Sequence, residues 1–206
     1  MMRRFALAWG GPLVLLALAG APSARRPAAG APRATQAVTV LAGGCYWGVE
    51  SVFRHVRGVE SAVSGFAVPA GAAGSATGSP AEAVRITYDP TRLSYRQILQ
   101  LFFSVAHDPT QLDRQGPDVG AEYRSIVFVA NERERGVVRA YVDSLTAARV
   151  FPRPIVTEIA ALHSFREVGA SEQNYAARHP TDPYIVANDV PKLEALRQRF
   201  PGLFRK

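Results

Sequence analysis

Hydrophobic positions along the chain follow two spacings, one typical of strands and one typical of helices. Residues 83–88 place apolar side chains at every second position, which predicts a half-buried strand. Residues 95–105 repeat apolar side chains every three or four positions after Ser94, a residue type that caps helix starts, so they predict a helix. The same criteria predict strands at residues 38–41, 60–68, 125–130 and 155–160, and helices at residues 46–56, 171–178 and 190–200. Asn131 and Glu134 form a variant of the capping box and predict one more helix after them.

Predicted helices and strands interleave, but the strands are short and half polar. This combination predicts an α+β fold, with a mixed and mainly antiparallel sheet and helices packed on it, rather than a doubly wound sheet buried on both faces. Residues 69–80 are small and rich in glycine, with no large apolar side chain, which predicts a loop.

The N-terminal residues have the composition of an export signal. Arg3 and Arg4 precede the apolar residues 5–19, and small residues at the end of that run offer a cleavage site. We therefore expect three segments: a signal peptide over residues 1–21, a disordered linker over residues 22–36 and one domain over residues 37–206. The expected location is outside the cytoplasm, in the periplasm, with an uncleaved N-terminal membrane anchor as the alternative.

Charge and cysteine content narrow the possible functions. The formal net charge is +7, but the basic residues are scattered singly and form no stripe with interleaved aromatics, so we expect no nucleic-acid partner. The chain has one cysteine, so its thiol is intermolecular, buried or reactive. No pair of cysteine or histidine residues has the spacing of metal ligands, so we expect no metal.

That single cysteine, Cys45, follows Gly43 and Gly44 and precedes residues with helical spacing, so we expect it in the first turn of a helix. Free N–H groups and the positive end of the helix dipole favour the thiolate, which is the nucleophilic form of the side chain. Tyr46 and Trp47 place aromatic rings beside the sulfur. A buried structural cysteine is the alternative.

Three other polar residues stand next to predicted strands or in loops, namely Glu82, Asp118 and Tyr123. Each has a simpler explanation, as a strand-end acid, a turn residue and a core ring. If they converge on Cys45, the set suits reduction of a sulfoxide. The thiolate attacks the sulfoxide sulfur, and a carboxylic acid kept neutral by burial protonates the leaving oxygen. The phenol stabilises that oxygen, the aromatic rings hold the S-methyl group, and a cysteine sulfenic acid remains.

Three sequence blocks resemble the peptide methionine sulfoxide reductase A family: Gly43-Gly44-Cys45-Tyr46-Trp47-Gly48, Ala81-Glu82-Ala83-Val84, and His107-Asp108-Pro109 through Asp118 to Tyr123-Arg124-Ser125. The resemblance spans about residues 38–188. It implies a ferredoxin-like two-layer sandwich and a peptide-methionine (S)-S-oxide reductase activity on free or protein-bound methionine sulfoxide, with no metal and no bound cofactor. The implied roles are nucleophile for Cys45, proton donor for Glu82, oxygen ligand for Tyr123, positioning of water or substrate for Asp118, and the methyl pocket for Tyr46 and Trp47.

The chain departs from the family pattern at several positions. The family usually has phenylalanine at the position of Tyr46, and a tyrosine in the loop before the glutamate, whereas no tyrosine lies between Tyr46 and Tyr88. Of an acid-tyrosine-histidine-glutamine run near the C-terminus, Gln173 is the part that remains. Loss of an oxygen ligand predicts slower turnover.

The absence of a second cysteine predicts how the enzyme is recycled. With no resolving cysteine in the chain, we expect an external thiol, from a thioredoxin-like protein or another dithiol donor, to reduce the sulfenic acid through an intermolecular mixed disulfide. We expect a monomer that repairs oxidised exported proteins. Two other functions stay open: a non-catalytic or weakly active relative that binds methionine sulfoxide, and another cysteine-nucleophile enzyme, a hydrolase or acyl transferase, whose base would be one of His55, His107, His163 and His179.

Overall fold

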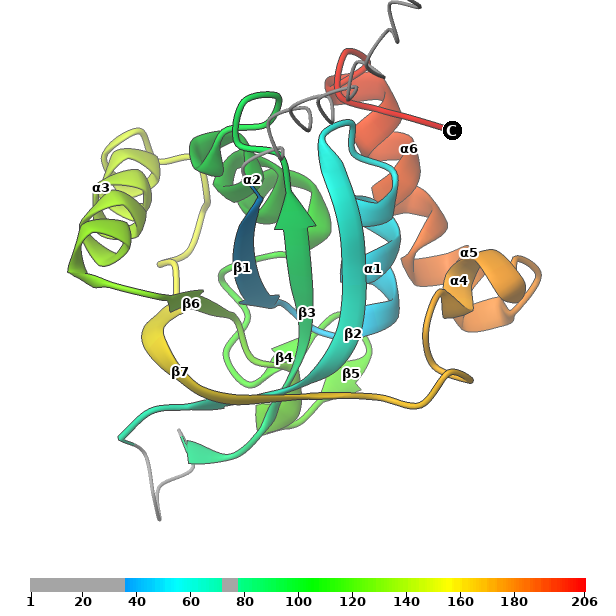
Figure 1. Cartoon of the computed structure of the whole chain (residues 1–206), viewed down its shortest axis with the longest axis horizontal. Coiled ribbons are helices and arrows are strands. Elements are labelled where there is room, and N and C mark those ends of the chain that lie inside the picture. Colours follow the sequence, from blue (N-terminus) through cyan, green and yellow to red (C-terminus); the bar gives the residue numbers. More distant parts are fainter. Residues whose placement is uncertain (1–35, 72–77) are drawn as a thin grey trace, which may run out of the picture. The chain divides into compact units, whose positions relative to one another are not determined.

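The computed structural model describes residues 36–71 and 78–206, and its strands pair in the order β1-β3-β2-β7-β6 (Figure 1). The bounds are β1 Ala37–Ala42, β2 Val59–Pro69, β3 Ala81–Tyr88, β6 Ile126–Val129 and β7 Glu158–Glu167. All pairings between these strands are antiparallel except that of β6 with β7. The predicted α+β class and the mixed, mainly antiparallel sheet are therefore confirmed.

The sheet closes on itself, which the ferredoxin-like two-layer sandwich did not anticipate. β1 pairs with β3 along one edge and with β6 along the other, so the described strands form a closed barrel instead of an open sheet. The closure depends on β7, whose residues 158–161 pair with β6 and whose residues 162–167 pair with β2. One strand thus bridges the two edges that would otherwise be open.

β7 also begins and ends later than the predicted strand at residues 155–160. Its second half is largely exposed, with polar residues among the apolar ones, so the alternation that marks a half-buried strand is missing there. The predictions for β1, β2, β3 and β6 are each correct to within about two residues. Residues 72–77 of the predicted loop, the predicted signal peptide and nearly all of the predicted linker lie outside the described residues.

The helices are α1 Tyr46–Arg54, α2 Tyr95–Leu101, α3 Glu132–Ala147, α4 Tyr175–Arg178, α5 Pro183–Asn188 and α6 Val190–Arg199. A π-helical segment, Phe102–Ala106, continues α2. Ser94 and Gln97 form a reciprocal capping box, and Asn131 caps the start of α3 by accepting the N–H of Glu134, so both predicted caps are confirmed. The helix expected at residues 171–178 is confined to α4, and α5 was not predicted.

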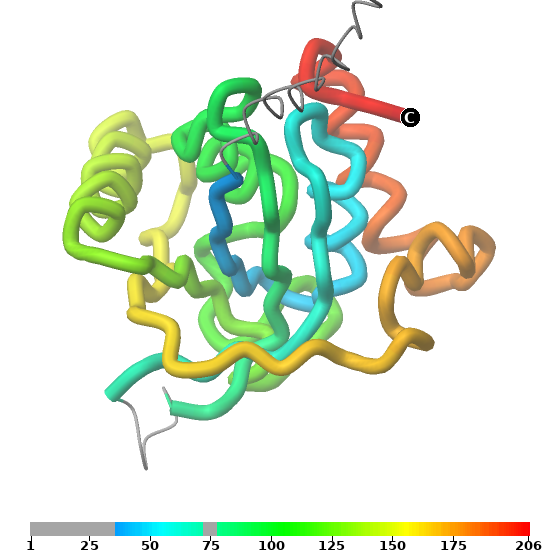
Figure 2. Tube along the Cα trace, viewed as in Figure 1, coloured from blue at the N-terminus to red at the C-terminus, as the bar shows by residue number. Residues whose placement is uncertain are grey.

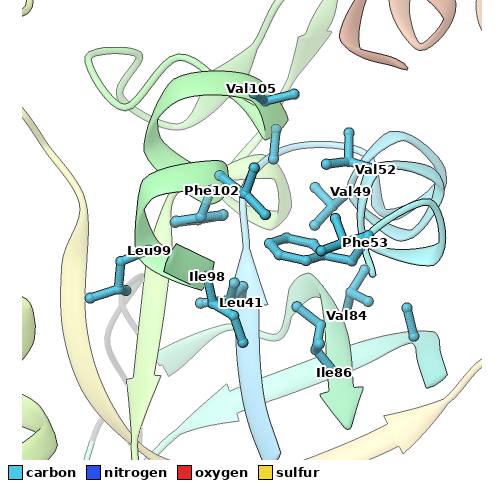
Figure 3. Close-up of a cluster of buried hydrophobic side chains, with 14 of the residues drawn as sticks. Leu41, Val49, Val52, Phe53, Val84, Ile86, Ile98, Leu99, Phe102 and Val105 are labelled. Carbon is cyan, nitrogen blue, oxygen red and sulfur yellow. The ribbon is translucent and has the colours of Figure 1, made fainter. Parts of the chain in front are cut away.

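The core lies between α1, α2 and the sheet (Figure 3). Phe53 and Val52 of α1 pack with Leu41 of β1, Ile86 of β3 and Ile98 of α2, all with no exposed surface. Burying each such side chain stabilises the fold by roughly 1.5–3 kcal/mol. This packing holds α1 against β1 and β3, and it therefore fixes where the first turn of α1 lies relative to the side chains of β3.

After β7 the chain crosses to the side of α1, where α4 and α6 both contact that helix (Figure 2). A short hairpin of β4 (Arg114–Gln115) and β5 (Asp118–Val119) and a 3-10 turn, Ala121–Tyr123, lie between α2 and β6 in the sequence. None of the helices within residues 36–71 and 78–206 is long and apolar enough to cross a membrane.

Candidate active site

Cys45 lies at the point where β1 ends and α1 begins, as the sequence predicts. It is the N-cap residue of α1, and its side chain is buried, with 8% of the residue exposed. The chain turns just before it at Gly44, whose φ of +87° favours glycine and whose absent Cβ would meet the side chain of Gln115 at 2.4 Å. The turn therefore needs glycine for its backbone conformation and for its space.

Glu82 reaches the same helix start from β3. Its carboxylate oxygen Oε2 accepts the backbone N–H of Tyr46 at 3.0 Å, and Tyr46 directly follows Cys45. The prediction put Glu82 just before the strand, whereas β3 already begins at Ala81, so Glu82 is held inside the strand and is paired with Phe66 of β2. Its backbone is therefore held by the pairing of β3 with β2.

Burial keeps a large fraction of Glu82 un-ionised near neutral pH. Desolvation is the main reason that the pKa of this carboxyl is raised to about 7, whereas the hydrogen bond from the N–H of Tyr46 lowers that pKa. The negative charges of Asp118, Glu122 and Glu172 raise the pKa further. The sequence-based expectation of a carboxylic acid kept neutral by burial is therefore supported by the site itself.

The expected thiolate at Cys45 is not what the resting site favours. Burial first, and then the charge of Glu82, raise the pKa of the thiol to about 12, although the N–H of Trp47 and the hydroxyl of Tyr184 act in the opposite direction. The N–H of Trp47 at the helix start does favour the thiolate, but desolvation has the larger effect on the pKa. The resting form is thus a thiol, and protonation of Glu82 removes one of the charges that oppose its ionisation.

Asp118 and Tyr123 both come close to Cys45 and Glu82. The half-buried Tyr123 has its pKa raised by burial and then by the charges of Glu82, Asp118 and Cys45, so its phenol lies within electrostatic range of those three groups. Asp118, in β5, accepts the hydroxyl of Tyr184 through Oδ2. The residues proposed from the sequence therefore converge on one site.

Tyr184 is the residue of this site that the sequence reading missed. Its hydroxyl contacts both Asp118 and Cys45, and burial, followed by the hydrogen bond to Asp118, raises the pKa of that phenol. A signal for it was present, because Asp182 and Pro183 are the residue types that start helices, and Asp182 does accept the N–H of Tyr184.

The glycine that ends the cysteine block, Gly48, faces a buried ion pair. A Cβ there would meet Asp189 Oδ1 at 2.2 Å and Lys192 Nζ at 2.4 Å. Asp189 and Lys192 pair at 3.2 Å, and burial raises the pKa of Asp189. Glycine at this position therefore lets α6 and the residues before it lie against the first turns of α1. Neither charged residue was singled out from the sequence.

The aromatic residues after the cysteine form a wall, as expected. The indole of Trp47 stacks on the ring of Tyr175, with centroids 3.9 Å apart and planes 10° apart, and meets Tyr184 edge-on at 5.9 Å. Tyr46 meets Trp47 and Phe66 edge-on. The polar ends of both wall residues are occupied, because one carboxylate oxygen, Glu172 Oε2, accepts Trp47 Nε1 at 3.2 Å and the Tyr46 hydroxyl at 3.4 Å.

His107 has a structural role. Its Nδ1 lies 2.9 Å from the carbonyl oxygen of Phe102 and its Nε2 lies 2.7 Å from Ser125 Oγ, so both ring nitrogens are engaged. Burial lowers the pKa of the imidazole to about 4, which keeps it neutral. The ring packs beneath Gly43, where an added Cβ would lie 3.0 Å from it. It supports the turn before Cys45 instead of acting as a base.

The other histidines have different neighbours. His55 lies after the last turn of α1, bonded to the carbonyl of Ser51, and His179 packs on Tyr175. His163 lies in the exposed part of β7. Among the described residues, no group of three His, Cys, Asp or Glu side chains could hold a metal ion.

Comparison with known proteins agrees with this geometry. The family model described as peptide methionine sulfoxide reductase matches residues 37–202. Peptide methionine sulfoxide reductase MsrA 2 of Mesorhizobium japonicum is 45% identical over 171 residues, which cover 80% of this chain and 88% of that protein. Peptide methionine sulfoxide reductase MsrA of Deinococcus radiodurans is 41% identical over 181 residues, or 84% of this chain and 87% of that protein.

Solved structures show the same fold. Methionine sulfoxide reductase A of Corynebacterium diphtheriae matches with a TM-score of 0.59 and 28% identity, over 74% of this chain and 78% of that chain. Mxr1 of Saccharomyces cerevisiae in reduced form matches with a TM-score of 0.62 and 23% identity, over 71% of this chain and 87% of that chain. The second similarity is one of fold.

Proposed function

The chain belongs to the peptide methionine sulfoxide reductase family and is a methionine sulfoxide reductase, and we propose that Cys45 is its nucleophile and Glu82 its proton donor. One observation carries this assignment. Glu82 Oε2 accepts the N–H of Tyr46, the residue next to Cys45, so an acid with a pKa of about 7 lies beside the only thiol of the chain. That acid is half protonated near neutral pH, which suits proton delivery.

The first half of the reaction transfers one oxygen atom. The sulfur of Cys45 attacks the sulfur of the sulfoxide while the carboxylic acid of Glu82 protonates the sulfoxide oxygen. The S–O bond of the substrate then breaks as the hydroxyl group passes to the Cys45 sulfur, and the sulfur–sulfur bond formed in the attack breaks. The thiol proton restores the carboxylic acid of Glu82, and methionine leaves. Oxygen remains on the enzyme as Cys45 sulfenic acid, so the substrate sulfur is reduced by two electrons and the cysteine sulfur is oxidised by two.

Two phenols serve the sulfoxide oxygen in this proposal. Tyr123 donates a hydrogen bond to it, as proposed from the family resemblance, and Tyr184 supplies the second hydroxyl. The chain has no tyrosine between Tyr46 and Tyr88, but the hydroxyl of Tyr184 lies close enough to Cys45 to lower the pKa of its thiol. In this structure the single hydrogen of that hydroxyl is donated to Asp118, so the hydroxyl must turn toward the substrate before it can donate to the sulfoxide oxygen. A donated hydrogen bond then stabilises the charge that develops on the oxygen.

Substrate selection rests on the aromatic wall. Tyr46 and Trp47 offer apolar ring faces to the S-methyl group, and their polar ends are turned to Glu172. With the sulfur set by Cys45, the oxygen by the phenols and the methyl group by the wall, the sulfoxide sulfur and two of its substituents have fixed places. We propose that this arrangement selects the S epimer, free or in proteins.

Recycling of Cys45 needs a thiol from another molecule, because the chain has no second cysteine. An external thiol attacks the sulfenic sulfur and releases water, and the resulting mixed disulfide is broken by a second thiol. A dithiol such as a thioredoxin-like protein supplies both steps, and no bound cofactor or metal takes part in the proposal.

Location and assembly remain part of the proposal. Residues 1–21 have the composition of an export signal, which supports a periplasmic or other extracytoplasmic location, where the enzyme would repair oxidised exported proteins. We propose that it acts as a monomer, because residues of one chain build the whole described site. Retention of the full-length chain in the membrane fraction would instead favour the uncleaved N-terminal anchor.

The decisive experiment is a stereospecific reductase assay. Peptides carrying S or R methionine sulfoxide are incubated with the protein and excess dithiol, and methionine is quantified. The proposal expects turnover of the S epimer alone and none by Cys45→Ser. Binding of the S peptide without methionine formation would instead favour a non-catalytic relative, and full activity of Cys45→Ser would contradict the mechanism.

A further inference from the structure

Glu172 connects the two residues of the aromatic wall through their polar ends. Its Oε2 lies 3.2 Å from Trp47 Nε1 and 3.4 Å from the Tyr46 hydroxyl. The other side of the Trp47 indole is held by the stacked ring of Tyr175. The indole thus has one face fixed by stacking and its N–H fixed by the carboxylate, which leaves it little rotational freedom.

The segment that carries Glu172 is itself anchored to the elements of the active site. The side-chain amide of Gln173 accepts the N–H of Ser64 at 2.9 Å and donates to the Ser64 carbonyl at 2.8 Å, which attaches the segment to β2. The N–H of Asn174 donates to both carboxylate oxygens of Glu50, at 2.9 and 3.0 Å, which attaches it to α1. Glu50 is buried and also accepts the Ser64 hydroxyl.

These hydrogen bonds fix the backbone next to Glu172 and so determine where its side chain lies. The two residues that follow Glu172 are tied to the helix that begins after Cys45 and to the strand that pairs with the Glu82 strand. A surface glutamate that met the aromatic wall by chance would not need the hydrogen bonds of Gln173 and Asn174 to hold its loop. Glu172 also replaces a residue in the stretch where the chain departs from the family pattern, and its partner Tyr46 is another such departure.

We propose that Glu172 is a positioning residue of the substrate pocket, which holds the rings of Tyr46 and Trp47 in the orientation that receives the S-methyl group. The two departures are partners. Tyr46 carries a hydroxyl that the usual phenylalanine lacks, and Glu172 accepts a hydrogen bond from that hydroxyl and keeps it turned away from the pocket. The inference rests on the proposed roles of Cys45, Tyr46 and Trp47.

The test uses the full chain and measures KM and kcat with an S-methionine-sulfoxide peptide. Glu172→Leu removes the acceptor, so we expect KM to rise roughly three- to tenfold with little change in kcat, because a misplaced wall weakens binding in the ground state and the transition state alike. Glu172→Gln keeps an acceptor oxygen and should stay within about twofold of wild type. The same Leu substitution at the exposed Glu132 of α3 is the matched control and should change neither constant.

A double variant tests the partnership directly. In Glu172→Leu the Tyr46 hydroxyl loses its acceptor at a buried wall, so adding Tyr46→Phe should recover part of the lost KM. A double variant no better than Glu172→Leu would contradict the proposed pairing. Equal KM values for the wild type and Glu172→Leu, or equal losses for the Leu and Gln variants, would overturn the positioning role.

Fluorescence supplies a readout that does not depend on turnover. The chain has two tryptophans, so Trp9→Phe leaves Trp47 as the sole reporter. We expect acrylamide to quench Trp47 more strongly in Glu172→Leu than in Glu172→Gln, whereas equal quenching would contradict the inference. Should the leucine variant fail to fold, Glu172→Asp carries the test, since its shorter side chain cannot reach both donors and should raise KM and quenching.

The outcome is separable from that of the proposed function. If Cys45→Ser abolishes turnover while Glu172→Leu behaves as wild type, the catalytic assignment stands and the positioning role is wrong. If the wild-type protein does not reduce methionine sulfoxide at all, the proposed function fails first, and the quenching comparison alone then decides whether Glu172 holds Trp47.

Discussion

The carboxylate of Glu82 accepts the backbone N–H of Tyr46 at 3.0 Å, which joins β3 to the first turn of α1 beside Cys45. This single contact places the proposed proton donor and the proposed nucleophile at the same helix start. It also couples their titration, because ionised Glu82 raises the pKa of the Cys45 thiol.

Replacing the acid should stop proton delivery while leaving the hydrogen bond to Tyr46 possible. We expect Glu82→Gln to lower kcat by about a hundredfold to ten-thousandfold, the usual contribution of general acid catalysis. The amide oxygen of glutamine can still accept the Tyr46 N–H, so the melting temperature should not fall. Glu122→Gln, which removes a nearby charge but no proton donor, is the control; equal losses for the two variants would count against Glu82 as the acid.

Activity should depend on the protonated form of Glu82. Burial raises the pKa of this acid from 4.5 to about 7, so its protonated fraction falls as the pH rises through 7. We expect kcat to be highest below pH 7 and to decline above it, measured with saturating substrate and a reductant that works across the range. A rate that stays constant from pH 6 to pH 9 (about two units above that pKa) would contradict this role.

The reactivity of the thiol should respond to the charge on Glu82. At neutral pH we expect slow alkylation of Cys45 by iodoacetamide, because burial raises the pKa of the thiol to about 12. Glu82→Gln removes the nearest opposing charge and should speed alkylation several-fold, as followed by intact mass. The single cysteine makes the modified site unambiguous. Slower alkylation in the variant would show that the charge of Glu82 acts in the opposite sense.

The Tyr184 hydroxyl should contribute more to kcat than the hydroxyl of Tyr175, whose ring also lies beside Trp47. We expect Tyr184→Phe to lower kcat by about tenfold or more, because it removes a donor that contacts both Cys45 and Asp118. Tyr175→Phe is the matched control, since that ring stacks on Trp47 but its hydroxyl bonds Asp182. Equal kcat values for the two variants would remove Tyr184 from the proposed mechanism.

One turnover without reductant should leave a stable oxidation product on the enzyme. We expect intact mass spectrometry to show one added oxygen atom, mapped to Cys45 and absent in Cys45→Ser, because the chain holds no second cysteine that could form a disulfide. Dithiol treatment should restore the original mass. An unchanged mass after methionine has formed would rule out the sulfenic acid route.

Local sequence rules predicted the elements that position the site. Two glycines before Cys45, the helical spacing after it, and the alternation through Ile86 each depend on neighbours within a few residues, and the structure confirms all three elements. The capping of α2 by Ser94 and of α3 by Asn131 follows the same logic, since a cap is satisfied by N–H groups two or three positions away. The predictions failed at β7, whose second half is largely exposed, at the start of α4 and at α5, because both helices are short.

The sequence by itself determined that one thiol stands at a strand-to-helix turn beside two aromatic rings, and its motifs pointed to the acid Glu82 and the phenol Tyr123 as candidates to serve it. Only the tertiary structure decided that the sheet closes, that the thiol rests protonated, and that Tyr184 and Glu172 join the site. These properties depend on desolvation and on contacts between residues more than a hundred positions apart. No local spacing records them, because burial and long-range proximity exist only once the chain has packed.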